Sequence, residues 1–92
     1  MLFNLLVQHE ALIEIQEAFE WYESRKSGLG FELINEIEQC YQRIAVNPQH
    51  YLSINKVYRR IALRRFPFML IYEIEGENVI VVSLHHFKQE RS

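Results

Sequence analysis

The residues best suited to chemistry are the arginines that cluster between Val57 and Arg65. Within this stretch Arg59, Arg60, Arg64 and Arg65 occur with no acidic residue among them. A guanidinium group is planar and presents several donors in a fixed fork, which suits bidentate contact with carboxylates or phosphates. The run therefore predicts a basic patch that another macromolecule can contact.

Strand alternation divides these arginines between two faces if Val57–Arg65 is a β-strand. One face holds Arg59 among aliphatic residues, so we expect Arg59 to be partly buried against a helix carboxylate or carbonyl. The other face holds Tyr58, Arg60 and Arg64. We predict that these three form a cationic, aromatic-edged surface on the open side of a sheet. The alternative is a solvated edge strand whose charges only discourage aggregation.

Two adjacent histidines, His85 and His86, are the candidates for proton exchange, because imidazole titrates near neutral pH. Adjacent strand residues point to opposite faces, and no cysteine or aspartate joins the pair. We therefore predict neither a metal site nor a cofactor. His85 has a structural alternative, which is a hydrogen bond that ties the last strand to the helix layer.

Two further residues could take part in function. Trp21 falls on the polar side of a predicted helix, so either the chain's own termini cover it or a partner contacts it. Cys40 lies on an apolar helix stripe with no histidine at helical spacing, which favours a packing role over a nucleophilic one.

The composition describes one small domain over residues 1–92, with 49% apolar residues and enough aromatic residues for one core. A single cysteine and no signal-peptide pattern predict a reducing, cytoplasmic setting. The apolar runs are far shorter than the roughly 20 residues that cross a bilayer. The net charge of −2 argues against coating nucleic acid by bulk electrostatics. Eight of the twelve glutamates precede residue 41, which predicts an acidic helical side.

Hydrophobic periodicity predicts elements in the order β-α-α-β-β-β. Amphipathic spacing indicates two helices, separated by glycines and ended by a proline, and β-rich runs indicate strands. The predicted ranges are Phe3–Gln8, Glu10–Lys26, a second helix to about Asn47, Val57–Arg65, Phe66–Glu75 and Val79–Phe87. Glu75–Asn78 is predicted to be a hairpin turn. The predicted class is therefore α+β, with a helical hairpin on one face of a small, mainly antiparallel sheet.

Several of these segments resemble the RelE/ParE toxin superfamily, and its ParE-like branch most of all. The stretch from Arg59 to Phe68, followed by Ile71-Tyr72 and by Val79–His85, is similar to the C-terminal half of that branch. The stretch from Ala18 to Phe31 is similar to its Trp-Tyr-Glu and Gly-Leu-Gly passage. The likeness covers nearly the whole chain in the same order.

The resemblance implies the toxin of a type II toxin–antitoxin module of the plasmid-stabilisation type, neutralised by a cognate antitoxin. ParE-like members are associated with poisoning DNA gyrase, whereas RelE-like members cut messenger RNA on the ribosome. The expected partner-contacting residues are Trp21, Tyr58, Arg59, Arg60, Arg64, Arg65 and Lys88.

RNA cleavage needs groups that take and give protons and cations that stabilise the phosphorane. Arg60, Arg64, His85 and His86 are weak candidates for these catalytic roles, and Phe87 stands where cleaving relatives often have an acid. We therefore favour a gyrase inhibitor that acts by binding and not as an enzyme. A ribosome-dependent endoribonuclease is the first alternative, and an inactive toxin-like interaction domain is the second.

Overall fold

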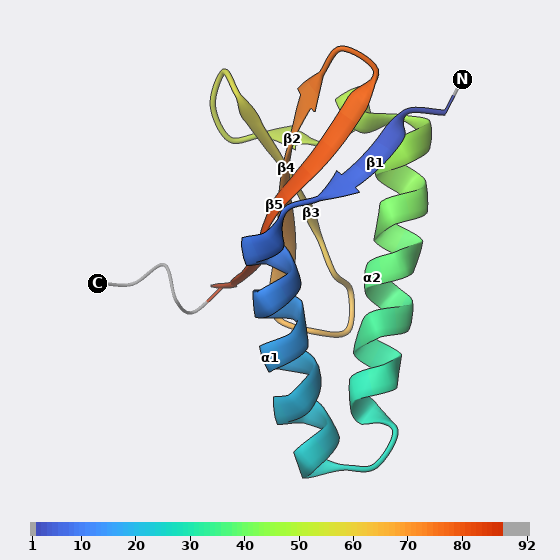
Figure 1. Ribbon diagram of the computed structural model, residues 1–92, viewed down its shortest axis with the longest axis vertical. Coiled ribbons are helices and arrows are strands. Elements are labelled where there is room, and N and C mark those ends of the chain that lie inside the picture. The colour runs from blue at the N-terminus through green and yellow to red at the C-terminus, as the bar shows by residue number, and fades with distance from the viewer. Residues whose placement is uncertain (1, 88–92) are drawn as a thin grey trace.

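The computed structural model of the protein describes residues 2–87, which form two helices and a five-stranded sheet (Figure 1). The elements are β1 (Asn4–Val7), α1 (His9–Arg25), α2 (Leu29–Val46), a 3-10 helix η1 (Pro48–His50), β2 (Leu52–Ser53), β3 (Tyr58–Ala62), β4 (Phe68–Glu75) and β5 (Asn78–His86). The strand order is β1-β5-β4-β3-β2. Only the β1–β5 pair is parallel, so the sheet is mainly antiparallel, as the sequence predicts.

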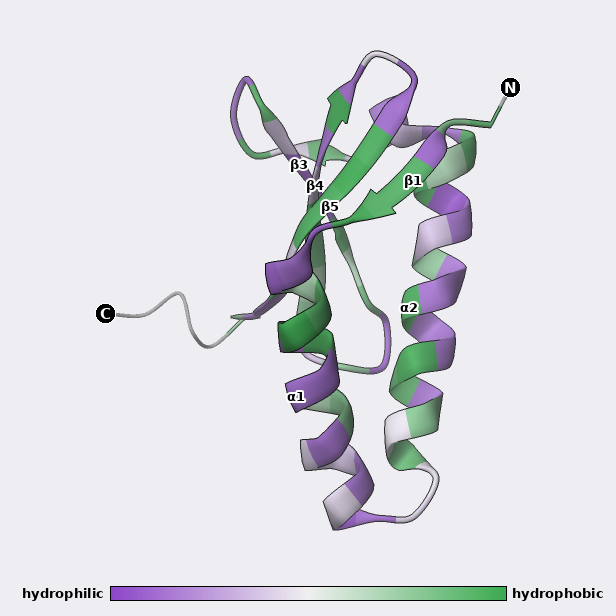
Figure 2. Ribbon diagram, viewed as in Figure 1, coloured by the Kyte–Doolittle hydropathy of each residue, from purple (hydrophilic) through white to green (hydrophobic). Residues whose placement is uncertain are grey.

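Both helices form where the apolar spacing predicts them. The buried positions of α1 are Ala11, Ile15 and Ala18, and those of α2 include Leu33, Ile37 and Ile44. The hydropathy colouring shows apolar and polar segments alternating along both helices (Figure 2). Since each helix has one apolar stripe, both pack against the same face of the sheet.

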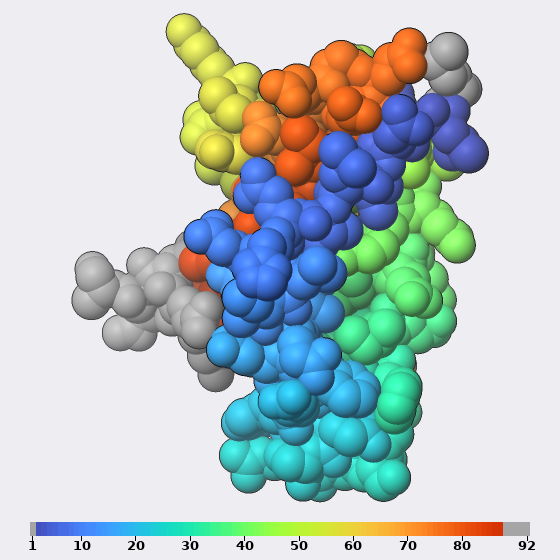
Figure 3. All heavy atoms as spheres, viewed as in Figure 1, coloured from blue at the N-terminus to red at the C-terminus, as the bar shows by residue number. Residues whose placement is uncertain are grey.

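One hydrophobic cluster joins the helices to the sheet. Leu70 and Tyr72 of β4 and Val79 and Val81 of β5 are completely buried in it. The Tyr72 hydroxyl donates a hydrogen bond to the Pro48 carbonyl over 2.6 Å, which fixes the chain that leaves α2 against the sheet. The space-filling view shows α1 and α2 packed side by side, with α2 continuing upward to the level of β1 (Figure 3).

The first two predicted strands after the helices are shorter in the structure than the sequence predicts. The predicted range Val57–Arg65 becomes β3, which ends at Ala62, and β4 begins at Phe68, after Pro67. The predicted loop after α2 contains η1 and the short β2, neither of which the sequence predicts. The Asn55 side-chain oxygen accepts the backbone N–H groups of Val57 and Tyr58, both at 2.8 Å, and so closes the β2–β3 turn.

The free edge of β5 is covered by a glutamate. β1 pairs with β5 only as far as Val81, and beyond it the Glu14 carboxylate accepts the Leu84 N–H at 2.9 Å and the Ser83 hydroxyl at 3.1 Å. Because an unpaired edge is a template for aggregation, this contact both protects the edge and holds α1 on the sheet.

The turn between the helices depends on two glycines. Gly28 has a φ of +93°, a conformation that residues with a Cβ atom rarely adopt. The Glu23 carboxylate accepts the N–H groups of Gly28 at 2.8 Å and Gly30 at 2.9 Å. A Cβ atom at Gly30 would lie 2.7 Å from the Phe19 carbonyl oxygen, so the helices approach here to a distance that only glycine allows.

No helix among the described residues is long and apolar enough to cross a membrane.

We expect Gly30→Ala to lower the free energy of unfolding by about 1–3 kcal/mol, because the new methyl group overlaps a backbone oxygen that cannot move aside. The matched control is Asn35→Ala on the exposed side of the same helix. Urea unfolding followed by circular dichroism measures both. Equal stability of the two variants would show that the helices can separate at no cost.

Candidate functional site

The arginines of β3 point to opposite faces, as alternation predicts. Arg59 is half-buried, and its Nη1 donates to the carbonyls of Tyr51 at 2.8 Å and Gln49 at 3.4 Å. Arg59 therefore holds η1 and the start of β2 against the sheet, which agrees with the predicted contact to a carbonyl. This internal use leaves Arg59 less available to a partner than its neighbour Arg60.

Arg60 lies on the face away from the helices. Its Nη1 is 3.4 Å from the Met69 sulfur. Together they line a hollow of about 360 Å³, the open-face hollow, whose walls are Leu52, Ser53, Ile54, Arg60, Met69, Ile71 and His85. No carboxylate lines it among the described residues. The open-face hollow thus combines one guanidinium and one imidazole with an apolar surround.

The predicted grouping of Arg64 with Tyr58 and Arg60 is wrong. Arg64 follows the end of β3 and lines a different hollow of about 230 Å³, the helix-side hollow, which it shares with Arg43 and Arg65. The remaining lining residues are on α2 and include Glu32 and Glu36. The basic patch is therefore divided between the open face of the sheet and the outer side of α2.

The connection that carries Arg64 and Arg65 is held on α2 by the buried carboxylate of Glu36. Glu36 is 7% exposed and accepts the backbone N–H of Arg64 and, at 3.3 Å, that of Arg65. These hydrogen bonds draw the connection between β3 and β4 onto α2. The Arg65 side chain then forms an ion pair with Glu32, while Arg64 stays exposed.

Trp21 is 52% exposed and lines a third hollow of about 400 Å³ beside the end of β5. The Arg25 guanidinium lies over the indole ring, 4.4 Å from its centroid. Tyr22, Phe68 and His86 line the same hollow, here named the Trp21 hollow. Trp21 thus belongs to a surface feature that the sequence did not reveal.

The two histidines lie on opposite faces of β5, as predicted for adjacent strand residues. His85 is opposite Met69 and lines the open-face hollow. His86 packs edge-on against Phe68, with ring centroids 4.9 Å apart. Residues 2–87 contain no group of three side chains that could hold a metal ion. Lys88, the last predicted contact residue, lies outside the described residues.

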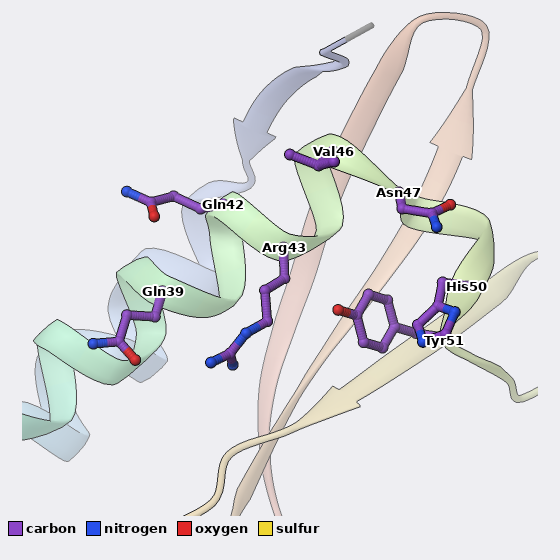
Figure 4. A pocket seen from close by; sticks show the side chains of 7 residues that line it. All are labelled: Gln39, Gln42, Arg43, Val46, Asn47, His50 and Tyr51. Carbon is purple, nitrogen blue, oxygen red and sulfur yellow. The ribbon is translucent and has the colours of Figure 1, made fainter.

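The sequence reasoning also missed a large hollow of about 510 Å³ beside the C-terminal end of α2 (Figure 4). Gln39 and Arg43 line both this hollow and the helix-side hollow, so the two adjoin along α2. In Figure 4 the Arg43 side chain extends from α2 toward the strands, and the Tyr51 ring lies across the space from the helix. The signal that could have found it is the polar spacing on α2 opposite its apolar stripe.

Burial raises the pKa of two tyrosines and of the cysteine. It raises the pKa of Tyr72 to about 12, although the nearby Arg59 charge opposes the shift, and it raises the pKa of Tyr41 to about 12 with a contribution from Glu38. Burial also raises the pKa of the Cys40 thiol despite the nearby Arg43. These three groups are therefore protonated at neutral pH, and Cys40 is not an activated nucleophile.

A helical hairpin on one face of a mainly antiparallel sheet, with arginine on the open face, is the arrangement that the resemblance to the RelE/ParE superfamily implies. The family described as ParE toxin of type II toxin–antitoxin system, parDE, matches residues 5–91. The chain therefore belongs to the ParE toxin family and is a toxin of a type II toxin–antitoxin system, a context that includes an antitoxin partner.

Solved structures share this fold. The chromosomal ParDE toxin–antitoxin system of P. aeruginosa matches with a TM-score of 0.78 and 13% identity, over 92% of this chain and 96% of that one. A mutant of the E. coli toxin RelE in the free state gives 0.63 and 16%, over 97% and 87%. The YoeB dimer of Staphylococcus aureus gives 0.62 and 13%, over 94% and 98%. A search of curated proteins returns no match. At these identities the likeness concerns the fold alone.

We expect Glu36→Ala to lower the free energy of unfolding by about 3 kcal/mol, because it leaves backbone N–H groups of Arg64 and Arg65 without their charged acceptor. Glu38→Ala, an exposed glutamate on the same helix, is the control and should change stability by less than about 0.5 kcal/mol. Urea unfolding measures both. Equal effects would mean that water replaces the carboxylate without cost.

Proposed function

We propose that this toxin acts by binding a protein, that the protein is DNA gyrase, and that a cognate antitoxin neutralises it. The single observation that carries the proposal is the setting of Arg60. Its guanidinium stands on the open sheet face beside Met69, Leu52 and Ile54, with no carboxylate lining the hollow among the described residues. Arginine and methionine within apolar surroundings are typical of the centres of protein–protein interfaces.

Exposed apolar side chains continue this surface toward the turn between β2 and β3. Leu52 is 61% exposed, Ile54 is 47% exposed and Val57 is 55% exposed. Large apolar side chains beside an arginine support a contact that excludes water. The hydrogen bonds of the arginine are stronger in such a contact, because the dielectric constant around it is low.

The helix-side hollow supports the antitoxin part of the proposal. Arg65 is neutralised by Glu32, whereas no carboxylate within residues 2–87 lies at ion-pair distance from Arg43 or Arg64. An acidic segment of an antitoxin laid along the outer side of α2 would supply the missing charge. The proposal assigns the protein to the cytoplasm, where gyrase acts, and to a plasmid-stabilisation system.

We expect the purified protein to inhibit supercoiling by DNA gyrase, and Arg60→Ala to weaken that inhibition about tenfold, which corresponds to one interface residue of intermediate energy. The control is Lys26→Ala, an exposed cation at the far end of the helical hairpin, which should inhibit like the unaltered chain. A gel assay of plasmid topoisomers gives the inhibitory concentrations. Full gyrase activity at high concentrations of unaltered protein would reject the proposed target.

A second function is favoured by one observation, which is that Arg60 and His85 line the same hollow. A guanidinium can stabilise a phosphorane and an imidazole can exchange a proton, so ribosome-dependent RNA cleavage is the rival. Under our proposal, messenger RNA on translating ribosomes stays intact when the protein is added. Cleavage in the ribosomal A site that Arg60→Ala abolishes would establish the rival instead. Expression that slows neither growth nor replication would indicate an inactive toxin-like domain.

A further inference from the structure

The Trp21 hollow has the chemistry of a binding site for a cationic side chain. Its walls are aromatic, formed by Trp21 and Tyr22 of α1 and Phe68 of β4. Its rim carries the carboxylates of Glu14 and Glu17. An aromatic wall attracts a cation through the electron density of its face, and a carboxylate at the same place adds charge and directional hydrogen bonds.

The carboxylates of Glu14 and Glu17 have different roles. Glu14 already accepts the Leu84 N–H at 2.9 Å and the Ser83 hydroxyl at 3.1 Å, so it holds α1 on β5. Glu17 is exposed, and no cation within residues 2–87 pairs with it. Glu17 is therefore the carboxylate that can receive a charge from outside.

The indole already binds one guanidinium from the chain itself. Arg25 lies over Trp21 at 4.4 Å from the ring centroid and is not among the residues that line the hollow. The Trp21 ring also meets the Tyr22 ring edge to face, with centroids 4.8 Å apart, and both rings line the hollow that is offered to a second group. A guanidinium needs little desolvation to lie against an aromatic ring, which favours arginine over lysine as the occupant.

We propose that the Trp21 hollow receives an arginine side chain from a protein partner. The stem of that side chain packs against the side of the hollow that Trp21 and Tyr22 form, where their rings meet edge to face, and its guanidinium pairs with Glu17. This site prefers a basic anchor, whereas Arg60 and the helix-side hollow prefer acidic ones, so a partner that wraps the toxin must carry both charges at separate places. Identifying the partner as the antitoxin rests on the proposed function, but the preference of the hollow does not.

The chain offers its own reporter, because Trp21 is its single tryptophan. Tryptophan fluorescence of the full chain is titrated with the capped tripeptide Leu-Arg-Leu and with the same peptide carrying citrulline, which has the shape of arginine without its charge. We expect a saturable change with the arginine peptide and about fivefold weaker binding of the citrulline peptide. Glu17→Gln should weaken arginine binding about fivefold, whereas Glu10→Gln, on the same helix but outside the hollow, should not.

Three outcomes overturn the proposal: no saturable change, equal binding of both peptides, or unchanged binding by Glu17→Gln. The sequence after Phe87 contains Lys88 and Arg91, which are possible occupants from the chain itself. If the full-length variant Lys88→Gln/Arg91→Gln binds the arginine peptide much more tightly than the unaltered chain, the site serves the chain's own tail and not a partner. Peptide binding is measured without gyrase, and supercoiling inhibition by the unaltered chain is measured separately, so a failure of this inference is distinct from a failure of the proposed target.

Discussion

The contact on which the arrangement of the surface depends is a helix carboxylate that accepts backbone N–H groups of a neighbouring segment. Glu36 does this for the connection between β3 and β4, Glu14 for the edge of β5, and Glu23 for the turn between the helices. Each carboxylate satisfies donors that neither helix nor sheet can satisfy, and a charged acceptor makes each bond stronger than a neutral one. These three glutamates of the first 40 residues are therefore used to hold the backbone. Among residues 2–87, the only arginine that forms an ion pair with a carboxylate is Arg65.

The division of the arginines follows from this use of acids. The Leu63 N–H donates to the Phe68 carbonyl over 2.9 Å, so the chain reverses after Leu63 and Arg64 lies in the connection between β3 and β4. Because the Glu36 carboxylate draws that backbone to α2, the toxin presents cations at two sites and an acidic, aromatic hollow at a third. A partner that covers one site alone would meet a single sign of charge, whereas one that wraps the molecule would meet both.

The sequence predicts the elements well, because apolar spacing, glycines and prolines are local signals. The helix ends at Arg25 and Val46, the hairpin turn and the opposite directions of His85 and His86 all follow from them. Prediction from the sequence fails where a residue distant in the chain determines the local structure. Glu36 lies 28 positions before Arg64 in the chain, and nothing in strand alternation reveals that it redirects the backbone. The sequence does not predict the hollows for the same reason, since each hollow is lined by residues from two or more elements.

The balance between binding and catalysis can be argued from the protons that the site could move. Burial raises the pKa of Tyr41 and of Tyr72 to about 12, so neither hydroxyl acts as an acid at neutral pH. The Tyr72 hydroxyl also donates a hydrogen bond to the Pro48 carbonyl. Of the described residues, the open-face hollow offers only His85 for proton transfer. General acid–base cleavage of RNA needs one group to take a proton and another to give one, and a single imidazole would have to do both within one turnover. An arginine in an apolar setting needs no such second group to bind a protein, and this difference is the support that the open-face hollow lends to the proposal of binding.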